Sequence, residues 1–205
     1  GYIIIGVIVG GRLGYVLFYN PIFYFENILE IFMIWNGGMS FHGGLVGVVV
    51  AIYIFSKIKN LNYIIYFDTI CCVAPIGIFL GRIANFVNSE LYGIPTDKPW
   101  GVIFPKVDNI LRHPSQLYEA FLEGLVLFII INTLIRKKIL FHGGVSFLFL
   151  IIYGLFRIIS EQFREPDGHM GFLLNGISMG SALSIVMIII GTIFLSKLII
   201  NEKNK

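Results

Sequence analysis

Long apolar runs constrain this chain more than any other feature. A helix needs about 20 consecutive apolar residues to cross the hydrocarbon core of a bilayer. Several runs of the 205-residue sequence approach or reach that length, and 57% of the residues are hydrophobic while 13% are charged. The sequence therefore predicts an all-α, polytopic helical membrane protein. We expect residues 1–205 to form a single transmembrane bundle.

Six membrane spans are expected from these runs. They cover Tyr2–Phe18, Phe41–Phe55, Tyr63–Val87, Ser115–Ile135, Val145–Phe163 and Gly176–Ile200. The interfacial segment 21–40 includes an apolar stretch, residues 21–35, that is too short to span and carries Glu26 and Glu30, which predicts an interfacial helix. Gly1 already lies inside an apolar run, so we expect one N-terminal span to be missing and the full protein to have seven.

The distribution of Lys and Arg predicts the orientation of the bundle. These residues concentrate in the segments after the second, fourth and sixth spans, which should face the cytoplasm. The loop 91–113 then lies on the extracytoplasmic side. The net charge of +3 is small and its basic residues lie in short loops, so nucleic acid is not an expected partner.

The run GRIANFVNSELYG, Gly81–Gly93, places polar groups inside the third span: Arg82, Asn85 and Asn88, followed by Glu90. A charge at the centre of a bilayer costs roughly 2.5–3.5 kcal/mol on insertion scales, so such residues usually face a protein interior or a wet cavity. Helical spacing puts Arg82 and Asn85 on one face. We interpret this face as one wall of a polar pocket.

Other polar residues reach the same depth. Arg12 in the first span, Arg82 in the third and Arg157 in the fifth all lie roughly 8–12 Å below the extracytoplasmic boundary, at 1.5 Å per residue. The boundary itself carries His42, His113, Gln116, Tyr118 and Glu119. An ion conduit would spread its polar groups across the whole bilayer, so this arrangement favours a site near the headgroups.

The fifth span carries a polar stripe of Tyr153, Arg157 and Glu161. One interpretation is an Arg157–Glu161 ion pair that only holds the bundle together. Against it, too few carboxylates of clear depth are expected to neutralise the three intramembrane arginines. The planar fork of arginine matches phosphate oxygens bidentately, which favours a phospholipid phosphate site.

Other polar groups leave alternatives open. Gln116, Glu119 and Glu123 share a face that would hydrogen-bond the arginines, hold water or clamp two helices. His42 is a structural residue or a proton acceptor. We expect structural roles for Asp68, Cys71, Cys72 and the glycines Gly6, Gly10 and Gly14, none for His142 in the site, and neither a metal site nor a cofactor.

Four motifs in this order resemble those of the phosphatidylglycerol–prolipoprotein diacylglyceryl transferases of bacteria: HGGLVG, GRIANFVNSELYG, RHPSQLYEAFLEG and YGLFRIISEQFREPD. The resemblance covers nearly the whole chain. It implies a multi-pass enzyme of the bacterial inner membrane whose site faces the extracytoplasmic leaflet. The reaction it implies transfers diacylglyceryl from phosphatidylglycerol to the lipobox cysteine of a preprolipoprotein, releasing glycerol 1-phosphate.

The resemblance also implies which residues are functional. Arg82 and Arg157 match the essential arginines of the family. Its other functional positions are matched by His42, Asn85, Glu90, Gly93, Tyr153 and Glu161. We assign catalytic roles to His42, Arg82, Arg157 and Glu161, with Glu90 a lesser candidate for the base, and add Asn88, His113, Gln116 and Glu119 to the substrate-binding set. Ala84 departs from the usual glycine, and the functional N-terminal tyrosine of the family has no counterpart here.

Two other classes of protein remain as alternatives. A transporter for an anionic solute would use the arginines as its binding site, although no inverted repeat or pair of broken spans is evident in the sequence. A scaffold that binds membrane lipids without chemistry is the third class.

Overall fold

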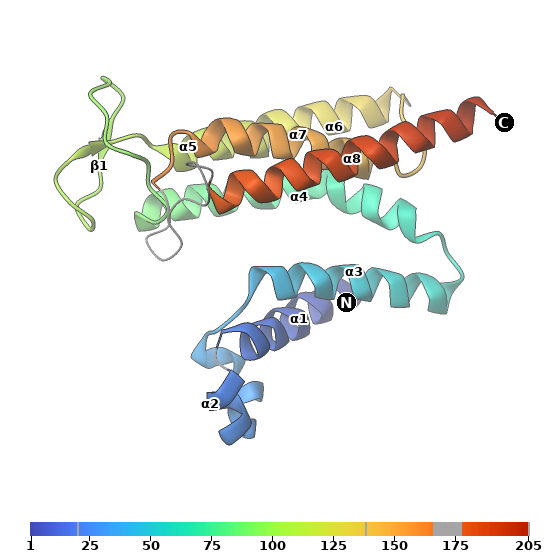
Figure 1. Cartoon of the computed structure of the whole chain (residues 1–205), viewed down its shortest axis with the longest axis horizontal. Helices are drawn as coiled ribbons and strands as arrows, with labels where there is room; N and C mark the ends of the chain where they lie inside the picture. The colour runs from blue at the N-terminus through green and yellow to red at the C-terminus, as the bar shows by residue number, and fades with distance from the viewer. Residues whose placement is uncertain (20, 138, 166–177, 205) are drawn as a thin grey trace. The chain divides into compact units, whose positions relative to one another are not determined.

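The computed structural model is helical over most of its length, as Figure 1 shows. It describes residues 1–19, 21–137, 139–165 and 178–204, and for Phe41, His42 and Met179 the backbone alone. The helices form two compact units, residues 1–66 and residues 67–205, which we describe separately. That all helices form one bundle stays a prediction.

The first unit is built on two helices that pack side by side, α1 (Tyr2–Phe18) and α3 (Phe41–Lys59). Glycines let the two backbones touch: a Cβ at Gly10 would lie 2.7 Å from the Cα of Gly47 and would overlap the carbonyl oxygen of Gly43. The predicted close-packing role of the glycine stripe in α1 is confirmed. Small residues at such crossings are typical of membrane helices.

Three short helices connect α1 and α3, where the sequence predicted one interfacial helix. They are α2 (Pro21–Glu26), η1 (Ile28–Phe32) and η2 (Ile34–Asn36), the last two being 3₁₀ turns. The prediction of a single helix was therefore wrong. The physical reason is Arg12, because its buried guanidinium binds backbone carbonyls that would otherwise point along a helix axis. It donates to the oxygens of Ile31 at 2.9 Å, Met33 and Gly38 at 3.2 Å, and Glu30 and Gly37.

The second unit contains the long helices. They are α4 (Tyr63–Asn88), whose first residues belong to the other unit, a run of α5 (Ser115–Glu119), η3 (Ala120–Val126) and α6 (Leu127–Arg136), then α7 (Gly144–Glu161) and α8 (Met179–Lys203). Leu127, Ile131 and Val145 form its buried core, and the free thiols Cys71 and Cys72 pack against it as expected.

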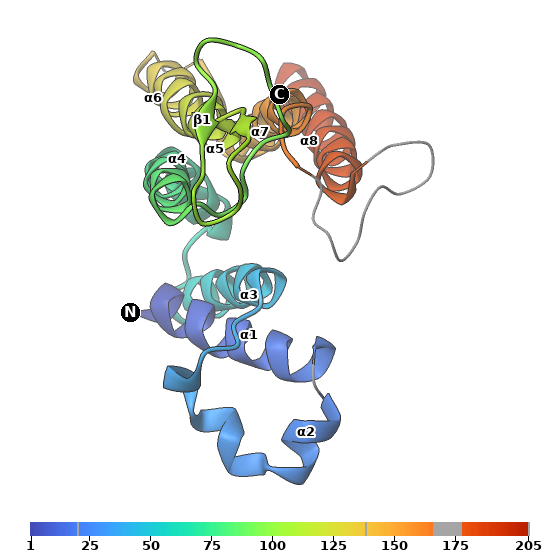
Figure 2. The same cartoon turned by 90° about the vertical axis from the view of Figure 1, so that its left-hand side faces the viewer.

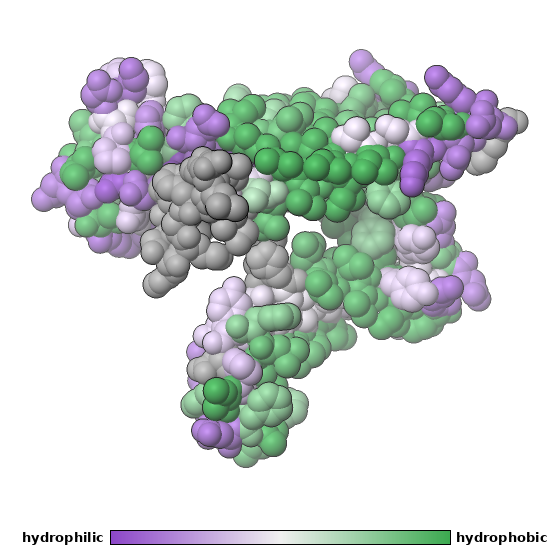
Figure 3. All heavy atoms as spheres, viewed as in Figure 1, coloured by the Kyte–Doolittle hydropathy of each residue, from purple (hydrophilic) through white to green (hydrophobic). Residues whose placement is uncertain are grey.

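Helices form at all six places where the sequence predicted spans. Four of them are long and apolar enough to cross a membrane among the described residues: Tyr63–Asn88, Ser115–Arg136, Gly144–Glu161 and Gly180–Lys203. The apolar helix Tyr2–Phe18 is shorter. In Figure 3 apolar residues cover the middle of the helices of the second unit, and polar residues gather at their two ends. The chain is therefore a helical membrane protein.

At one end of the second unit, Asp68 holds the start of α7. Its carboxylate accepts hydrogen bonds from the backbone N–H of Gly143 at 2.6 Å and of Ser146 at 2.9 Å, and from the Ser146 hydroxyl at 2.6 Å. These donors are the otherwise unsatisfied groups of a helix N-terminus. The predicted structural role of Asp68 as a hydrogen-bonding residue is confirmed.

At the opposite end lies a small sheet of β1 (Val102–Ile103) and β2 (Leu111–Arg112), visible in Figure 2. Arg112 fastens this part: it pairs with Asp108 at 2.7 Å and Glu165 at 3.2 Å and donates to the carbonyl oxygen of Gly93 at 3.1 Å. Its guanidinium also stacks over the Tyr92 ring. Arg112 thereby ties the loop after α4 to the segment after α7.

Candidate functional site

A π-helical turn shapes the polar centre of the second unit. η3 interrupts the run from Ser115 to Arg136 with wide i to i+5 turns, a rare geometry that is frequent at functional sites. Glu119 and Glu123 are four residues apart, and both side chains reach the same two arginines from one face of this run. Gly124 lets α4 approach this face, since a Cβ there would lie 2.7 Å from that of Phe79. Arg82, one turn beyond Phe79, thereby reaches the two carboxylates.

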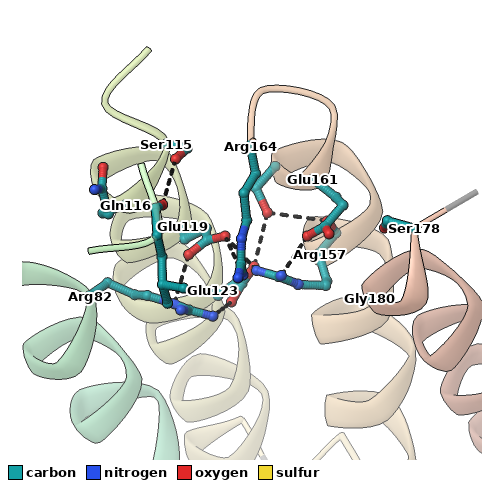
Figure 4. A network of polar contacts seen from close by, with 12 residues as sticks. Arg82, Ser115, Gln116, Glu119, Glu123, Arg157, Glu161, Arg164, Ser178 and Gly180 are labelled. Carbon is teal, nitrogen blue, oxygen red and sulfur yellow. Dashed lines mark hydrogen bonds and ion pairs between the residues drawn. The ribbon is translucent and has the colours of Figure 1, made fainter. Parts of the chain in front are cut away.

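Glu119 lies between the two arginines that the sequence singled out. The Nε of Arg82 is 2.8 Å from its Oε2, and Nη1 of Arg157 pairs with its Oε1. Nη1 of Arg164 stands 3.8 Å from the same Oε1. The Glu119 side chain is fully buried. One carboxylate therefore joins guanidinium groups from α4, from α7 and from the segment after α7, as Figure 4 shows.

Two further carboxylates complete this group, which we call the arginine–glutamate cluster: Arg82, Glu119, Glu123, Arg157, Glu161 and Arg164. Glu123 lies 3.7 Å from nitrogens of both Arg82 and Arg157 and accepts a 2.9 Å hydrogen bond from the Ser160 hydroxyl. Glu161 pairs with Arg157 at 2.5 Å. Gly180 of α8 packs against Glu161, where a Cβ would lie 2.9 Å from Oε1.

The charges of the cluster balance. The expectation that carboxylates are too few to neutralise the intramembrane arginines was wrong, because Glu119, Glu123 and Glu161 all pair with Arg82 or Arg157. The third arginine of that expectation, Arg12, has backbone carbonyls as partners within the first unit. In the described part of the chain, side chains from separate helices thus provide the countercharge of Arg82 and Arg157.

The turn after α4 lies next to this cluster in the fold. The backbone N–H of Glu90 donates to the backbone oxygen of Asn85 at 2.9 Å. Ser89 and Leu91 have positive φ angles of 62° and 54°. Gln116 donates to the backbone oxygen of Glu90 at 2.7 Å, and the Ser115 hydroxyl donates to that of Leu91 at 3.1 Å. The predicted binding residue Gln116 therefore anchors this turn, and no hydrogen bond to an arginine is recorded for it among the described residues.

Gly93 follows the turn, and the absence of a side chain there lets two chain segments, at His113 and Phe163, pack against it. Its N–H donates to the carbonyl oxygen of His113 at 3.1 Å, and the neighbouring Ile94 donates to that of Phe163 at 3.1 Å. A side chain at Gly93 would overlap both carbonyl oxygens. This position is thus buried and sterically fixed, which gives a structural reason for glycine there.

The remaining predicted residues lie at different places. Asn88 is exposed in the last turn of α4, and Tyr153 is partly buried, one turn before Arg157 on α7. His113 hydrogen-bonds Tyr118 at 3.0 Å, and both line an apolar pocket of about 400 Å³ that Ser160 also borders. His42 is the second residue of α3 in the first unit, and its side chain lies outside the described residues.

Sequence reasoning missed two parts of the site, Arg164 and Ser160. Arg164 was assigned to a loop, although it follows Glu161 at i+3 and Arg157 at i+7, the spacing of one helix face. Ser160 carried no signal, because a lone serine in an apolar run is common. For Glu123 the sequence left open a bond to the arginines, a water site or an interhelical clamp, and the structure places it 3.7 Å from nitrogens of both Arg82 and Arg157.

Comparison with known proteins agrees with this picture. Residues 1–197 match the family described as "Prolipoprotein diacylglyceryl transferase". Three relatives are named phosphatidylglycerol–prolipoprotein diacylglyceryl transferase. The one from Rickettsia bellii is 54% identical over 96% of this chain and 75% of its own length. That of Paramagnetospirillum magneticum is 54% identical over 93% and 72%, and that of Wolbachia pipientis is 50% identical over 92% and 73%. The chain belongs to this family.

Membership of this family makes the chain an enzyme, a diacylglyceryl transferase. None of the three relatives supports a transporter. The family name also agrees with the chemistry of the cluster, since guanidinium groups bind the phosphate of a phospholipid well.

Proposed function

We propose that the arginine–glutamate cluster binds the phosphate of phosphatidylglycerol while the diacylglyceryl group is transferred to the lipobox cysteine of a preprolipoprotein. The observation that supports this most is that Arg82 and Arg157, from α4 and α7, point at one carboxylate. Two forks that converge on two carboxylate oxygens are also placed to hold two phosphate oxygens. Membrane lipids and the preprolipoprotein are the expected partners.

The reaction follows from this placement. The thiolate sulfur of the acceptor attacks the glycerol carbon that bears the phosphate, a C–S bond forms, and the C–O bond to phosphate breaks. Glycerol 1-phosphate leaves with the bonding electrons. Arg82 and Arg157 stabilise the charge that develops on the departing phosphate. The acceptor thiol is itself the nucleophile, so no protein side chain forms a covalent intermediate.

The thiol must lose its proton, because a thiol is a weak nucleophile below its ordinary pKa of about 8.5. His42 is the proposed acceptor of this proton. Glu161 is the lesser candidate, since its carboxylate is already engaged by Arg157 at 2.5 Å. Glu90 is exposed at the turn after α4 and remains a second alternative.

Glu119 has a different proposed role. It occupies the position between the two guanidinium groups where the phosphate would bind. It keeps both arginines extended and correctly oriented while no lipid is present, and it shares them with the phosphate when lipid enters. Gln116 and Ser115 hold the turn that carries Glu90 and Gly93, so we assign them positioning roles.

The proposed location is the bacterial inner membrane with the cluster in the extracytoplasmic half. Its support is the charge of the two ends. Arg136 and Lys137 end the helix that begins at Ser115, near the cluster, so they mark the opposite end of the unit. Basic residues at that end are typical of the cytoplasmic side.

A reconstitution assay tests this function. Purified protein is incorporated into phosphatidylglycerol vesicles with a synthetic lipobox peptide, and the peptide mass is followed together with released glycerol 1-phosphate. We expect a diacylglyceryl mass increase on the peptide and an equal amount of product. Replacement of phosphatidylglycerol by phosphatidylcholine should abolish both. Uptake of a labelled anion without lipid consumption would contradict the proposal and support a transporter.

A further inference from the structure

The arginine–glutamate cluster has no net formal charge. Its three guanidinium groups face three carboxylates, and the side chains are largely removed from water: those of Glu119 and Glu123 are fully buried and that of Arg157 is 10% exposed. An uncompensated charge in such a place is costly. The phosphodiester of a phospholipid brings one negative charge, so its binding leaves the cluster with an excess of one anion unless a proton enters as well.

Glu119 and Glu161 are poorly suited to take this proton. Glu119 pairs with both Arg82 and Arg157 and lies near Arg164. Glu161 has a 2.5 Å contact with Arg157. Protonation of either residue would remove a direct ion pair with a guanidinium group.

Glu123 differs from both. Its guanidinium neighbours are 3.7 Å away, beyond hydrogen-bond distance, and within the described part of the chain it accepts a hydrogen bond only from the neutral hydroxyl of Ser160. Its Oε2 atom is buried and has no hydrogen-bond partner among the described residues. A proton on this oxygen would therefore disrupt no ion pair shorter than 3.7 Å, unlike a proton on Glu119 or Glu161.

We propose that Glu123 takes up one proton from solution when an anionic phosphate group binds between Arg82 and Arg157. The step converts the carboxylate of Glu123 to a carboxylic acid, keeps the cluster neutral and leaves Glu119 ionised. This inference rests on the proposed function, because it assumes the same phosphate site. Among the residues that the structure describes, the charged and titratable groups around Glu123 are Arg82 on α4, Glu119 on α5, Tyr153, Arg157 and Glu161 on α7, and Arg164 after α7.

Proton uptake can be measured directly. The whole protein in neutral detergent is titrated with short-chain phosphatidylglycerol in weakly buffered solution near neutral pH, with a pH indicator, while native mass spectrometry counts bound lipid. The phosphodiester does not titrate in this range, so any uptake belongs to the protein. We expect about one proton per bound lipid, and none with phosphatidylcholine of equal chain length.

Variants identify the group that takes the proton. Glu123→Gln should still bind phosphatidylglycerol but lose nearly all uptake, whereas the matched exposed change Glu26→Gln should leave it unchanged. Bound phosphatidylglycerol without proton uptake, or full uptake in Glu123→Gln, would overturn the inference. The same titration is repeated with glycerol 1-phosphate, and the measured uptake is corrected for the ionisation of that compound. It distinguishes a lipid headgroup from a free phosphate ester as the ligand.

If the Glu123→Gln protein does not fold, a second measurement on the wild-type protein tests the proposal. Infrared difference spectra should show a new carboxylic acid band in the wild-type protein when phosphatidylglycerol binds. Ser160→Ala, which removes the hydrogen bond to Glu123, should shift this band, and an unshifted band would overturn the assignment. Peptide modification without proton uptake contradicts only this inference, whereas uptake without modification contradicts only the proposed function.

Discussion

Buried arginines occur in both units of the molecule, and their partners differ in kind. Arg12 in the first unit is 3% exposed and donates to backbone carbonyl oxygens of residues 30–38. Arg157 in the second unit is 8% exposed and pairs with the carboxylates of Glu119 and Glu161. Both bury a guanidinium group equally well, so burial alone does not distinguish a structural arginine from a binding one.

The difference lies in what a ligand could replace. Backbone carbonyls are fixed by the chain, and an anion that displaced them from Arg12 would have to unfold the segment between α1 and α3. Carboxylate side chains can rotate or take a proton, so a phosphate can enter beside them and share Arg82 and Arg157 without disturbing a helix. We therefore propose that Arg12 serves the fold and that Arg82 and Arg157 serve the reaction.

The largest effect is expected at His42, the proposed proton acceptor, which belongs to the first unit. His42→Gln should lower turnover by about 10²–10⁴-fold, the range for loss of a general base. Because the acceptor thiol ionises by itself near pH 8.5, much of this activity should return at high pH. The measurement is a pH–rate profile of peptide modification. A loss that is equal at every pH would instead make His42 structural.

Arg157→Lys tests the second unit. Lysine keeps the charge but loses the fork, so turnover should fall by roughly 10²–10³-fold, as for loss of one donor to a developing oxyanion. Binding of phosphatidylglycerol should persist. The matched control is Arg136→Lys at the exposed end of α6, which should not change turnover. Unchanged release of glycerol 1-phosphate by Arg157→Lys would remove this residue from the mechanism.

Arg12→Lys is the counterpart in the first unit and should act on stability. Lysine cannot reach all the carbonyls that Arg12 binds, and loss of hydrogen bonds from a charged donor costs about 1.5–3 kcal/mol each when the partner is left unsatisfied. We expect a total loss of about 3 kcal/mol of unfolding free energy, measured as a lower Tm in detergent. Turnover per folded molecule should stay the same. A normal Tm with impaired turnover would place Arg12 in the site.

Much of the fold could be predicted from the sequence because hydropathy acts locally. The helices at the six predicted spans follow from apolar runs, and the contact of Gly10 with α3 follows from the spacing of small residues. The segment 21–36 could not be predicted, since its three short helices depend on a distant guanidinium, that of Arg12. Local pattern does not report such a tertiary hydrogen bond.

The site shows the same limit. Helical spacing correctly grouped Arg157 with Glu161, and depth correctly grouped Arg82 with Arg157. Helical spacing also grouped Glu119 with Glu123. That Glu119 lies between the two arginines depends on the close approach of α4 at Gly124, and a single sequence does not reveal such packing between helices.

The glycines of the two units sharpen the comparison further. Gly10→Ala would force the Cβ into the backbone of Gly43 and Gly47, so α1 and α3 must separate, at a cost of roughly 1–3 kcal/mol. Gly180→Ala meets only the end of the Glu161 side chain, which can rotate away. Its Tm should change little, while turnover falls because Glu161 leaves Arg157. Equal losses of Tm in the two variants would contradict this distinction.

The smallest effect is expected outside the membrane, at Asp108, which pairs with Arg112. Hydrogen bonds from Arg112 hold the pKa of Asp108 below its ordinary value of 3.8. A carboxyl whose pKa is lower in the folded than in the unfolded state stabilises the fold above its unfolded pKa. That contribution is lost as pH falls from about 3.8 through the lower folded value. Asp108→Asn should therefore lower Tm slightly at neutral pH and not at strongly acidic pH. A Tm difference from the wild-type protein that persists in acid would assign the effect to packing of the loop rather than to the charge of Asp108.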